Sequence, residues 1–250
     1  MDRPRRTLYP AAAPVWMVGD APARVLDLGT GHGAFAQLVH EAGHQVFGLD
    51  RRLEHVAALP ERLGSRLHVV GQVESLPYLS CHFDVVTASQ TLHRFAPGLA
   101  LTEIARVLKP GGHLAVAYTT RDDTVPWVKR LVTLMREADP DAMSGDYGVE
   151  SLAAVADSAY FHDLVRKDFR HWVPTSRAGL IAMVERRRST AELGPEVREQ
   201  LLRQVGELYD SSARAPEPLL LPYQASCWRA VVDHSALALD DAEDVLQIRL

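Results

Sequence analysis

Short apolar runs alternate with amphipathic stretches over the first half of the chain. Compact runs of branched and aromatic residues predict five strands, at residues 24–28, 46–49, 67–70, 83–88 and 113–118. Between the strands, apolar side chains recur with helical spacing, as in Phe35, Leu38, Val39 and Ala42, and in Leu101, Ile104, Ala105 and Leu108. Another helix is predicted over residues 53–63, short or bent because it contains Pro60. This alternation predicts an α/β fold with a doubly wound, mostly parallel sheet and helices on both faces.

The second half is richer in helical patterns. We predict helices at residues 131–138, 175–188 and 195–209, and strands at 169–173 and 224–232. The chain therefore divides into an N-terminal segment (1–21), a core (22–121), a helix-rich insertion before the last strands (122–211), and a return to the sheet with a C-terminal tail (212–250).

Composition narrows the class of protein. The 250 residues are 47% hydrophobic and 24% charged, as in an ordinary globular protein, and the formal charge of −5 gives no reason to expect nucleic acid or an anionic membrane as partner. Cys81 and Cys227 are too few for a disulfide framework and lack metal-ligand spacing, so no metal is expected. No secretory signal or transmembrane run is visible, which leads us to expect a cytoplasmic enzyme or binding protein.

The chemistry lies in the segment VLDLGTGHGAF, residues 25–35, where a predicted strand turns directly into a helix. Gly29, Thr30, Gly31 and Gly33 form the turn, and glycine allows the backbone to approach a ligand closely. Alone the pattern is weak, since Gly29, Gly31 and Ala34 also satisfy the looser dinucleotide-binding pattern.

Asp27 separates the two interpretations, because it stands two residues before the first glycine. A carboxylate there repels the pyrophosphate of a dinucleotide, whereas S-adenosylmethionine (SAM) has no phosphate and carries a sulfonium and an ammonium. Two unit charges about 4 Å apart interact by roughly 4 kcal/mol at an effective dielectric near 20. Asp27 therefore favours SAM, although it could also be a strand-end carboxylate satisfied by loop amides.

Asp50 ends the second predicted strand, 21 residues after Gly29. A carboxylate there can accept hydrogen bonds from the ribose hydroxyls of an adenosine. The feature fits NAD as well as SAM, so it indicates adenosine rather than a reaction. The alternative is a surface acid paired with Arg51 or Arg52.

Four segments occur in the order and spacing of one known family: VLDLGTGHGAF, FGLD, GQVESLPYLSCHFDVVTASQTLHRF and EIARVLKPGGHLAVAY. They resemble the successive motifs of the class I SAM-dependent methyltransferases, which have a Rossmann-like fold. The resemblance covers residues 22–120. The bacterial small-molecule type is the most similar, through Arg3-Pro4, Tyr9-Pro10 and Leu221-Pro222-Tyr223.

The resemblance implies further contacts to SAM, and to the product S-adenosylhomocysteine. Gln72, Val73 and Glu74 fall where the family lays backbone and a polar side chain against the adenine, and Arg51 follows Asp50. Many relatives have an aspartate where Gln72 stands. Ser89 and Gln90 match positions whose backbone approaches the methionyl part. Arg94 replaces an aromatic residue found in close relatives, so the wall facing the substrate is expected to differ.

Methyl transfer from a sulfonium is an in-line displacement, and positioning of the acceptor supplies most of the catalysis. A general base is needed only if the acceptor loses a proton in the transition state. His93, beyond the end of a parallel strand, is the candidate base, although a lone histidine is more often structural. The family and the acidic charge suggest a small-molecule acceptor, with the N-terminal segment and region 122–211 closing over the site.

Two other functions stay open. One is a dinucleotide-dependent oxidoreductase on a related fold, against which Asp27 and the lack of a hydride-transfer motif argue. The other is a SAM-fold binding or regulatory protein without turnover, which the departures at Gln72 and Arg94 keep open.

Overall fold

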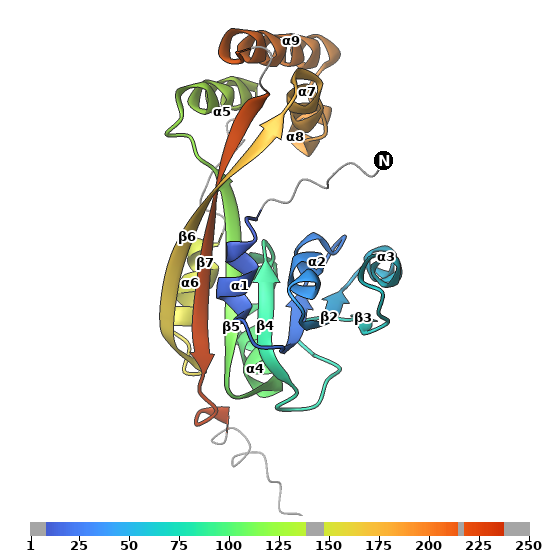
Figure 1. The fold of residues 1–250 in the computed structure, drawn as a ribbon, viewed down its shortest axis with the longest axis vertical. Coiled ribbons are helices and arrows are strands. Elements are labelled where there is room, and N and C mark those ends of the chain that lie inside the picture. The colour runs from blue at the N-terminus through green and yellow to red at the C-terminus, as the bar shows by residue number, and fades with distance from the viewer. Residues whose placement is uncertain (1–8, 139–147, 215–217, 238–250) are drawn as a thin grey trace, which may run out of the picture. The chain divides into compact units, whose positions relative to one another are not determined.

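The computed structural model describes residues 9–138, 148–214 and 218–237. Arg3 and Pro4, which together with Tyr9 and Pro10 resemble the bacterial small-molecule type, lie outside the described residues. Within the described residues, a seven-stranded sheet has the order β3-β2-β1-β4-β5-β7-β6 (Figure 1). Its strands are β1 Arg24–Leu28, β2 Gln45–Asp50, β3 His68–Val70, β4 Phe83–Ser89, β5 Leu108–Arg121, β6 Phe161–Thr175 and β7 Leu219–Val232. This architecture confirms the predicted Rossmann-like α/β fold.

The first five strands run parallel, as predicted. In the register, Asp27 pairs with Gly48 on β2 and with Thr87 on β4, and Asp50 pairs with Val70 on β3. The arrow of β7 points opposite to that of β4 (Figure 1). Because parallel strands end at the same edge, the ends of β1, β2 and β4 bring distant sequence motifs together.

Helices cover both faces of the sheet, and on each face an apolar cluster lies between the helices and the strands. α1 (Ala12–Val18), α2 (Ala34–Glu41) and α3 (Leu53–Leu63) contribute Met17, Phe35 and Leu59 to one cluster. α4 (Pro97–Val107) and α6 (Val149–Ala156) contribute Ile104 and Val155 to the other. The remaining helices are the short 3₁₀ helix η1 (Leu92–Arg94), α5 (Pro126–Ala138), α7 (Arg177–Glu185), α8 (Arg188–Ala191) and α9 (Pro195–Ser212).

Several elements differ from the sequence-based prediction. Helices α1 and α6 were not predicted. The strand predicted at 169–173 is part of the much longer β6, and Thr175 ends that strand instead of beginning a helix. β6 is one of the two edge strands of the sheet, and most of its side chains are exposed. Inner strands such as β1 and β2 are buried almost continuously and so carry an apolar run, and this signal is weak along β6.

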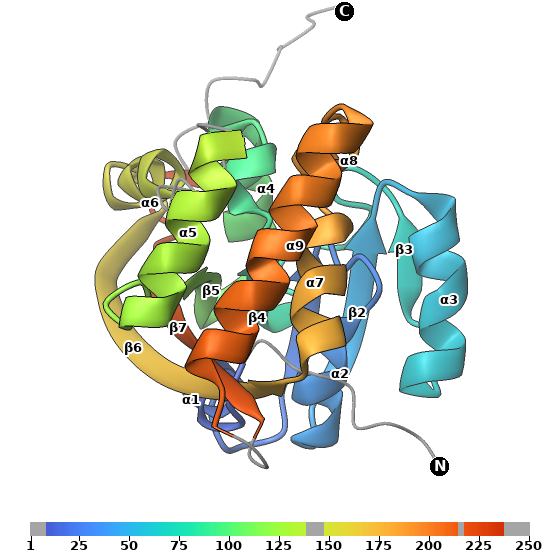
Figure 2. The ribbon, with the colours of Figure 1, turned by 90° about the horizontal axis from the view of Figure 1, so that it is seen from above.

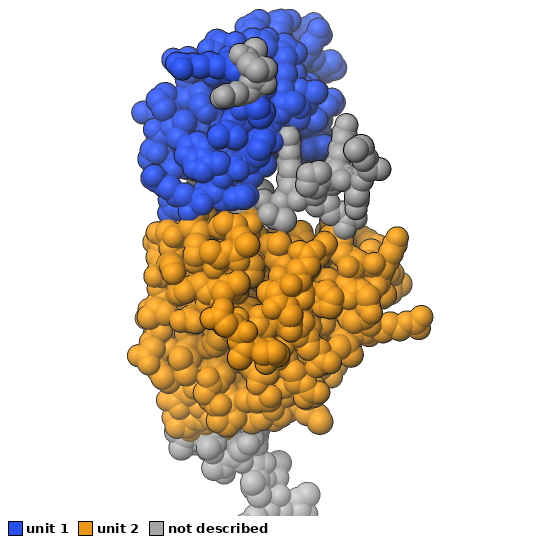
Figure 3. All heavy atoms as spheres, in the orientation of Figure 1, with its two compact units in different colours: residues 1–8, 119–146, 170–224 blue, residues 9–118, 147–169, 225–250 orange. Residues whose placement is uncertain are grey.

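The chain forms two compact units (Figure 3). The larger comprises residues 9–118, 147–169 and 225–250, and it holds the first four strands. The smaller comprises residues 1–8, 119–146 and 170–224. In the smaller unit, α9 lies between α5 and α7 (Figure 2). Leu131, Leu180 and Val205, one from each of these helices, are fully buried in its core.

None of the helices among the described residues is long and apolar enough to cross a membrane.

Candidate cofactor-binding site

The glycine turn after β1 is held by backbone hydrogen bonds to the end of β2. The amides of Gly29 and Thr30 both donate to the carbonyl of Leu49, over 2.8 and 3.1 Å. Thr30 Oγ1 donates to the carbonyl of Asp27 over 2.7 Å, so this threonine closes the turn. Gly29 has φ +65°, and a Cβ there would lie 2.8 Å from Thr91 Cγ2. The turn therefore requires glycine at this position because Thr91, from beyond β4, packs directly against it.

Asp27 is buried beneath the turn, with 2% of its surface exposed. Thr87 Oγ1, on the neighbouring strand, donates a hydrogen bond to Asp27 Oδ1 over 2.8 Å. Burial raises the pKa of the Asp27 carboxyl to about 7, against the opposing effect of the Thr87 hydroxyl, which donates to it, and of the nearby Thr30 hydroxyl, and Asp50 raises it further. This group therefore changes its charge near neutral pH and would be stabilised as a carboxylate by an approaching cation.

Asp50 is bonded to backbone on both sides. Its Oδ2 accepts from the amide of Gly31 and its Oδ1 from the amide of Arg52, each over 2.9 Å. His55 Nδ1 lies 3.2 Å from Oδ2. Burial would raise the pKa of the Asp50 carboxyl, but these two amides and His55 outweigh it and lower the pKa. Asp50 is thus held ionised at the mouth of the glycine turn, and its partner in Arg52 is the backbone amide, not the guanidinium.

A pocket of about 630 Å³ opens beside Asp50. Seven predicted cofactor contacts line it, namely Gly29, Gly31, Asp50, Arg51, Gln72, Val73 and Glu74. The other predicted site residues, Asp27, Thr30, Gly33, Ser89, Gln90 and His93, are not among its lining. Sequence reasoning missed Leu49, Arg52, His55, Gly71 and Thr91 as lining residues, and left Arg94 and Phe95 outside the cofactor contacts. These residues could have been found from their position in the sequence, because each stands within a few residues of a predicted contact.

The segment after β3 forms one wall of the pocket. Val73 is buried with 3% of its surface exposed, whereas Gln72 is exposed. Glu74 Oε1 accepts a hydrogen bond from the amide of Ala96 over 2.9 Å, which ties this wall to the segment after η1. Glu74 therefore holds two parts of the pocket together through its side chain.

Ser89 and Gln90 lie at the end of β4, next to the N-terminal segment. Ser89 Oγ is 2.8 Å from the hydroxyl of Tyr9, whose ring packs edge-on against Phe35 with centroids 5.2 Å apart. Gln90 has φ +62°, a strained backbone for a residue other than glycine, and its amide donates to the carbonyl of Ala117. Tyr9 is buried and thereby ties the residues just before α1 to this strand end.

His93 lies on η1, between the pocket residues Thr91 and Arg94. Its side chain is largely exposed. Its amide donates to the Tyr118 hydroxyl over 3.2 Å, and its Nδ1 lies 3.4 Å from the same oxygen. Partial burial, together with the positive charge of Arg94, lowers the pKa of the imidazole. His93 is therefore neutral at physiological pH, as a proton acceptor must be.

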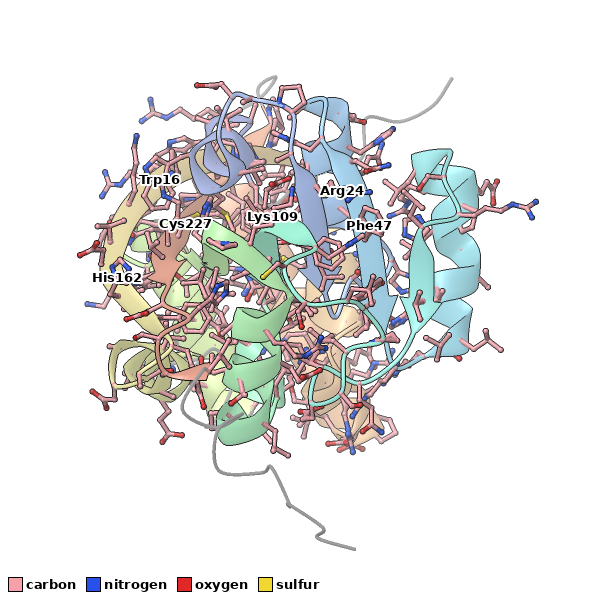
Figure 4. All side chains as sticks on the ribbon, turned by 90° about the horizontal axis from the view of Figure 1, so that it is seen from below. Trp16, Arg24, Phe47, Lys109, His162 and Cys227 are labelled. Carbon is pink, nitrogen blue, oxygen red and sulfur yellow. The ribbon has the colours of Figure 1, made fainter. Side chains whose placement is uncertain are left out.

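Asp84, a carboxylate at the opposite end of the strands, differs from Asp27 in its hydrogen-bonding partners. Asp84, at the start of β4, accepts from the amide of Arg24 over 2.8 Å and from Lys109 Nζ over 2.6 Å. Arg24 and Lys109 are labelled in Figure 4. Asp84 thus has a cationic side chain as partner, whereas the bonds recorded for Asp27 come from hydroxyl groups.

The charged and apolar groups of the site favour SAM over a dinucleotide. An adenosine fits, because the pocket has an ionised carboxylate at the end of β2 and an apolar wall from Leu49, Val73 and Phe95. A cationic amino-acid moiety suits a buried carboxyl such as Asp27, whose ionised form it would stabilise. A pyrophosphate at the turn would be repelled by Asp27 when that carboxyl is ionised, whereas Asp50 suits the ribose of either ligand.

Comparison with known proteins agrees with this chemistry. Residues 26–116 match the family profile described as a methyltransferase domain. An uncharacterized methyltransferase of Mycobacterium tuberculosis (strain ATCC 25618 / H37Rv) is 35% identical over 136 residues, which cover 54% of this chain and 56% of the relative. An uncharacterized methyltransferase-like protein of Schizosaccharomyces pombe is 30% identical over 144 residues, 56% of each chain. The chain thus spans little more than half the length of these relatives.

Among solved structures, a candidate type II methyltransferase from Anaeromyxobacter dehalogenans superposes with a TM-score of 0.65. It is 20% identical, and the match covers 92% of this chain and 97% of the other. At this identity the likeness supports the fold. It extends over nearly the whole chain, well beyond the residues that match the family profile.

Proposed function

Because this chain belongs to the class I SAM-dependent methyltransferases, we propose that it transfers a methyl group from SAM to a small-molecule acceptor by in-line displacement. The observation that carries the proposal is the pair of acids at the ends of β1 and β2. Asp27 is buried beneath the glycine turn, and Asp50 lines the pocket beside it. This pair suits a ligand with both an adenosine and a positive charge.

The residues divide the binding between them. Asp50 would accept the ribose hydroxyls, since a carboxylate has about four lone-pair sites and its two amide bonds leave capacity. Val73 and the backbone around Gln72 and Glu74 would face the adenine. Asp27, through the loop of Gly29 to Gly33, would stabilise the ammonium of the methionyl part, with Ser89 and Gln90 on its other side.

When bound, SAM supplies a methyl group already activated by its sulfonium. The protein then has to orient the acceptor and exclude water, and it needs a base only if the acceptor loses a proton. His93, next to two pocket-lining residues and neutral near pH 7, is the residue we propose for that proton.

The smaller unit, with helices α5, α7 and α9, is proposed to select the acceptor. Its partly exposed aromatic residues Trp127, Tyr209 and Tyr223 suit an organic molecule, and the acidic net charge gives no reason to expect nucleic acid. A cytoplasmic location and the absence of a nucleic-acid or membrane partner remain predictions from the composition.

Ligand binding distinguishes the proposal from the oxidoreductase alternative. Purified protein is titrated by calorimetry with SAM, S-adenosylhomocysteine and NAD(H). We expect micromolar binding of the two sulfur compounds and little or none of the dinucleotide. Micromolar binding of NAD(H) without a response to SAM would refute the proposal.

Turnover is a separate question, because a SAM-fold binding protein would pass the first test. Protein that binds SAM is incubated with methyl-labelled SAM and fractionated metabolite pools, with the Asp50→Ala variant as a matched blank. Label that enters a small organic molecule only with the wild-type protein supports the enzyme. Tight SAM binding without transfer to any pool would favour the regulatory alternative.

A further inference from the structure

A short hydrogen-bonded chain leads from the backbone of Gly148 to the imidazole of His93. Ser151 Oγ donates to the carbonyl of Gly148 over 2.8 Å, and it lies 3.0 Å from the Tyr118 hydroxyl. That hydroxyl in turn lies 3.4 Å from His93 Nδ1 and accepts from the His93 amide. All four residues belong to the larger unit, although Tyr118 and Ser151 are 33 positions apart in the sequence.

The direction of each hydrogen bond follows from the hydrogens available. A carbonyl can only accept, so the single hydrogen of the Ser151 hydroxyl is committed to Gly148. Ser151 Oγ must then accept from Tyr118, which commits the single hydrogen of the tyrosine hydroxyl. The Tyr118 oxygen is left with two lone pairs. One takes the His93 amide, and the other can interact favourably with Nδ1 only if that nitrogen carries a hydrogen.

We propose that Tyr118 and Ser151 are positioning residues that hold His93 in the tautomer protonated at Nδ1, so that Nε2 is the nitrogen that takes the proton of the methyl acceptor. This inference rests on the proposed methyltransferase function. In the step, the acceptor heteroatom loses its proton to Nε2, its electron pair forms the bond to the methyl carbon, and the electron pair of the broken carbon–sulfur bond stays on sulfur. The imidazolium that results then loses its proton to water.

Packing fixes the position of the Tyr118 hydroxyl. Tyr118 has 4% of its surface exposed, and the ring of Trp228 packs edge-on against it with centroids 6.1 Å apart. Gly148 has φ +108°, and a Cβ there would collide with the Tyr118 ring, so only glycine allows the ring to pack at this point. A buried ring held on two sides gives the exposed imidazole a fixed hydrogen-bonding partner.

The tautomer is directly measurable without knowing the acceptor. Protein labelled with ¹⁵N-histidine is studied by long-range ¹H–¹⁵N correlation NMR above the pKa of the ring, and the His93→Gln variant identifies the signals of His93. We expect Nδ1 protonated and Nε2 unprotonated. Tyr118→Phe, which keeps the ring but removes the hydroxyl, should shift the population toward the other tautomer, and Ser151→Ala should do so in part.

Tyr78→Phe provides the matched control. Its hydroxyl is buried and has no hydrogen-bond partner among the described residues, and it takes no part in the hydrogen bonds that link Gly148 to His93. This variant should leave the His93 signals unchanged. A wild-type signal protonated at Nε2, or a Tyr118→Phe spectrum identical to that of the control, would overturn the inference.

Kinetics with an identified acceptor give the second readout. Loss of general-base assistance typically costs about 10²–10⁴-fold in rate, so His93→Gln should lower kcat by at least about 100-fold. Tyr118→Phe should lower kcat about tenfold or more, with KM changed less than twofold. Failure of SAM binding would refute the proposed function and leave the tautomer result standing, whereas SAM binding with the wrong tautomer would refute this inference alone.

Discussion

Thr87 donates a hydrogen bond from Oγ1 to Oδ1 of Asp27 over 2.8 Å, and the two residues face each other as partners on neighbouring parallel strands. This is a fixed dipole directed at a carboxyl that burial holds near its protonation midpoint. The charge of Asp27 is therefore sensitive to pH, to a cationic ligand and to the Thr87 hydroxyl.

Ligand affinity should depend on pH near neutrality. The pKa of Asp27 is raised to about 7, and a ligand ammonium binds its ionised form better, so binding must release a proton below that pH. Affinity for S-adenosylhomocysteine should rise about tenfold from pH 6 to pH 8. Calorimetry across this range, in buffers of different ionisation enthalpy, measures both the affinity and the proton release. Asp27→Asn should bind more weakly and remove the slope, whereas an unchanged slope would place its origin in another group.

Thr87 should set the midpoint of that pH dependence. Thr87→Val removes the donor that stabilises the ionised Asp27, so the pKa of Asp27 rises further and the affinity at pH 7 falls several-fold. Thr87→Ser keeps the hydroxyl and should stay close to wild type. The same titrations provide the measurement. Equal midpoints in the valine and serine variants would show that this hydrogen bond has no effect on Asp27.

The ligand-free protein should gain stability when Asp27 loses its charge. In the native state the pKa is about 7, against an ordinary value of 3.8 for this carboxyl in an unfolded chain. Between these values the native state binds a proton that the unfolded chain does not, so the contribution of Asp27 to stability declines as pH rises from about 4 to 7. Asp27→Asn should therefore raise Tm more at pH 8 than at pH 5. The exposed Asp157→Asn is the control, and equal gains at both pH values would contradict the assignment.

Asp50 should matter for adenosine binding and for local stability. Asp50→Ala removes the acceptor for the part-buried amides of Gly31 and Arg52, which should lower the free energy of unfolding by about 1 kcal/mol. SAM and S-adenosylhomocysteine should both bind at least tenfold more weakly. Asp84→Asn, which weakens a carboxylate bonded to an amide and to Lys109, should lower Tm but leave both affinities unchanged. Parallel losses of affinity in the two variants would mean that Asp50 acts through folding alone.

The sequence was most informative where a residue is buried on an inner strand or stands in a turn. The strands from residues 24–28 and 83–88 were predicted almost to the residue, because apolar runs end sharply at polar or glycine residues. Asp27 and Asp50 were placed correctly at the ends of β1 and β2. Seven of the predicted contacts line one pocket, because each follows directly on a strand end that the apolar runs located.

Contacts between distant segments could not be predicted in the same way. Thr91 against Gly29, Glu74 with Ala96 and Tyr118 with Ser151 all depend on how strands pair and helices pack. The edge strand β6 was predicted too short because its exposed side chains carry little periodic signal. Tyr118 itself was assigned to a strand, but nothing in its own neighbourhood indicated that its hydroxyl bonds to a histidine 25 residues earlier.

Each of the strands β5, β6 and β7 contributes residues to both compact units. A cut that released the smaller unit as a fragment would have to break these strands in their middle. Apart from residues 1–8, that unit consists of two segments, 119–146 and 170–224, so exchanging it between relatives, for example to change the acceptor, requires four splice points, three of which fall within strands. Deletion of a single contiguous segment should therefore fail, whereas a graft joined at all four points with the strand pairing preserved should fold.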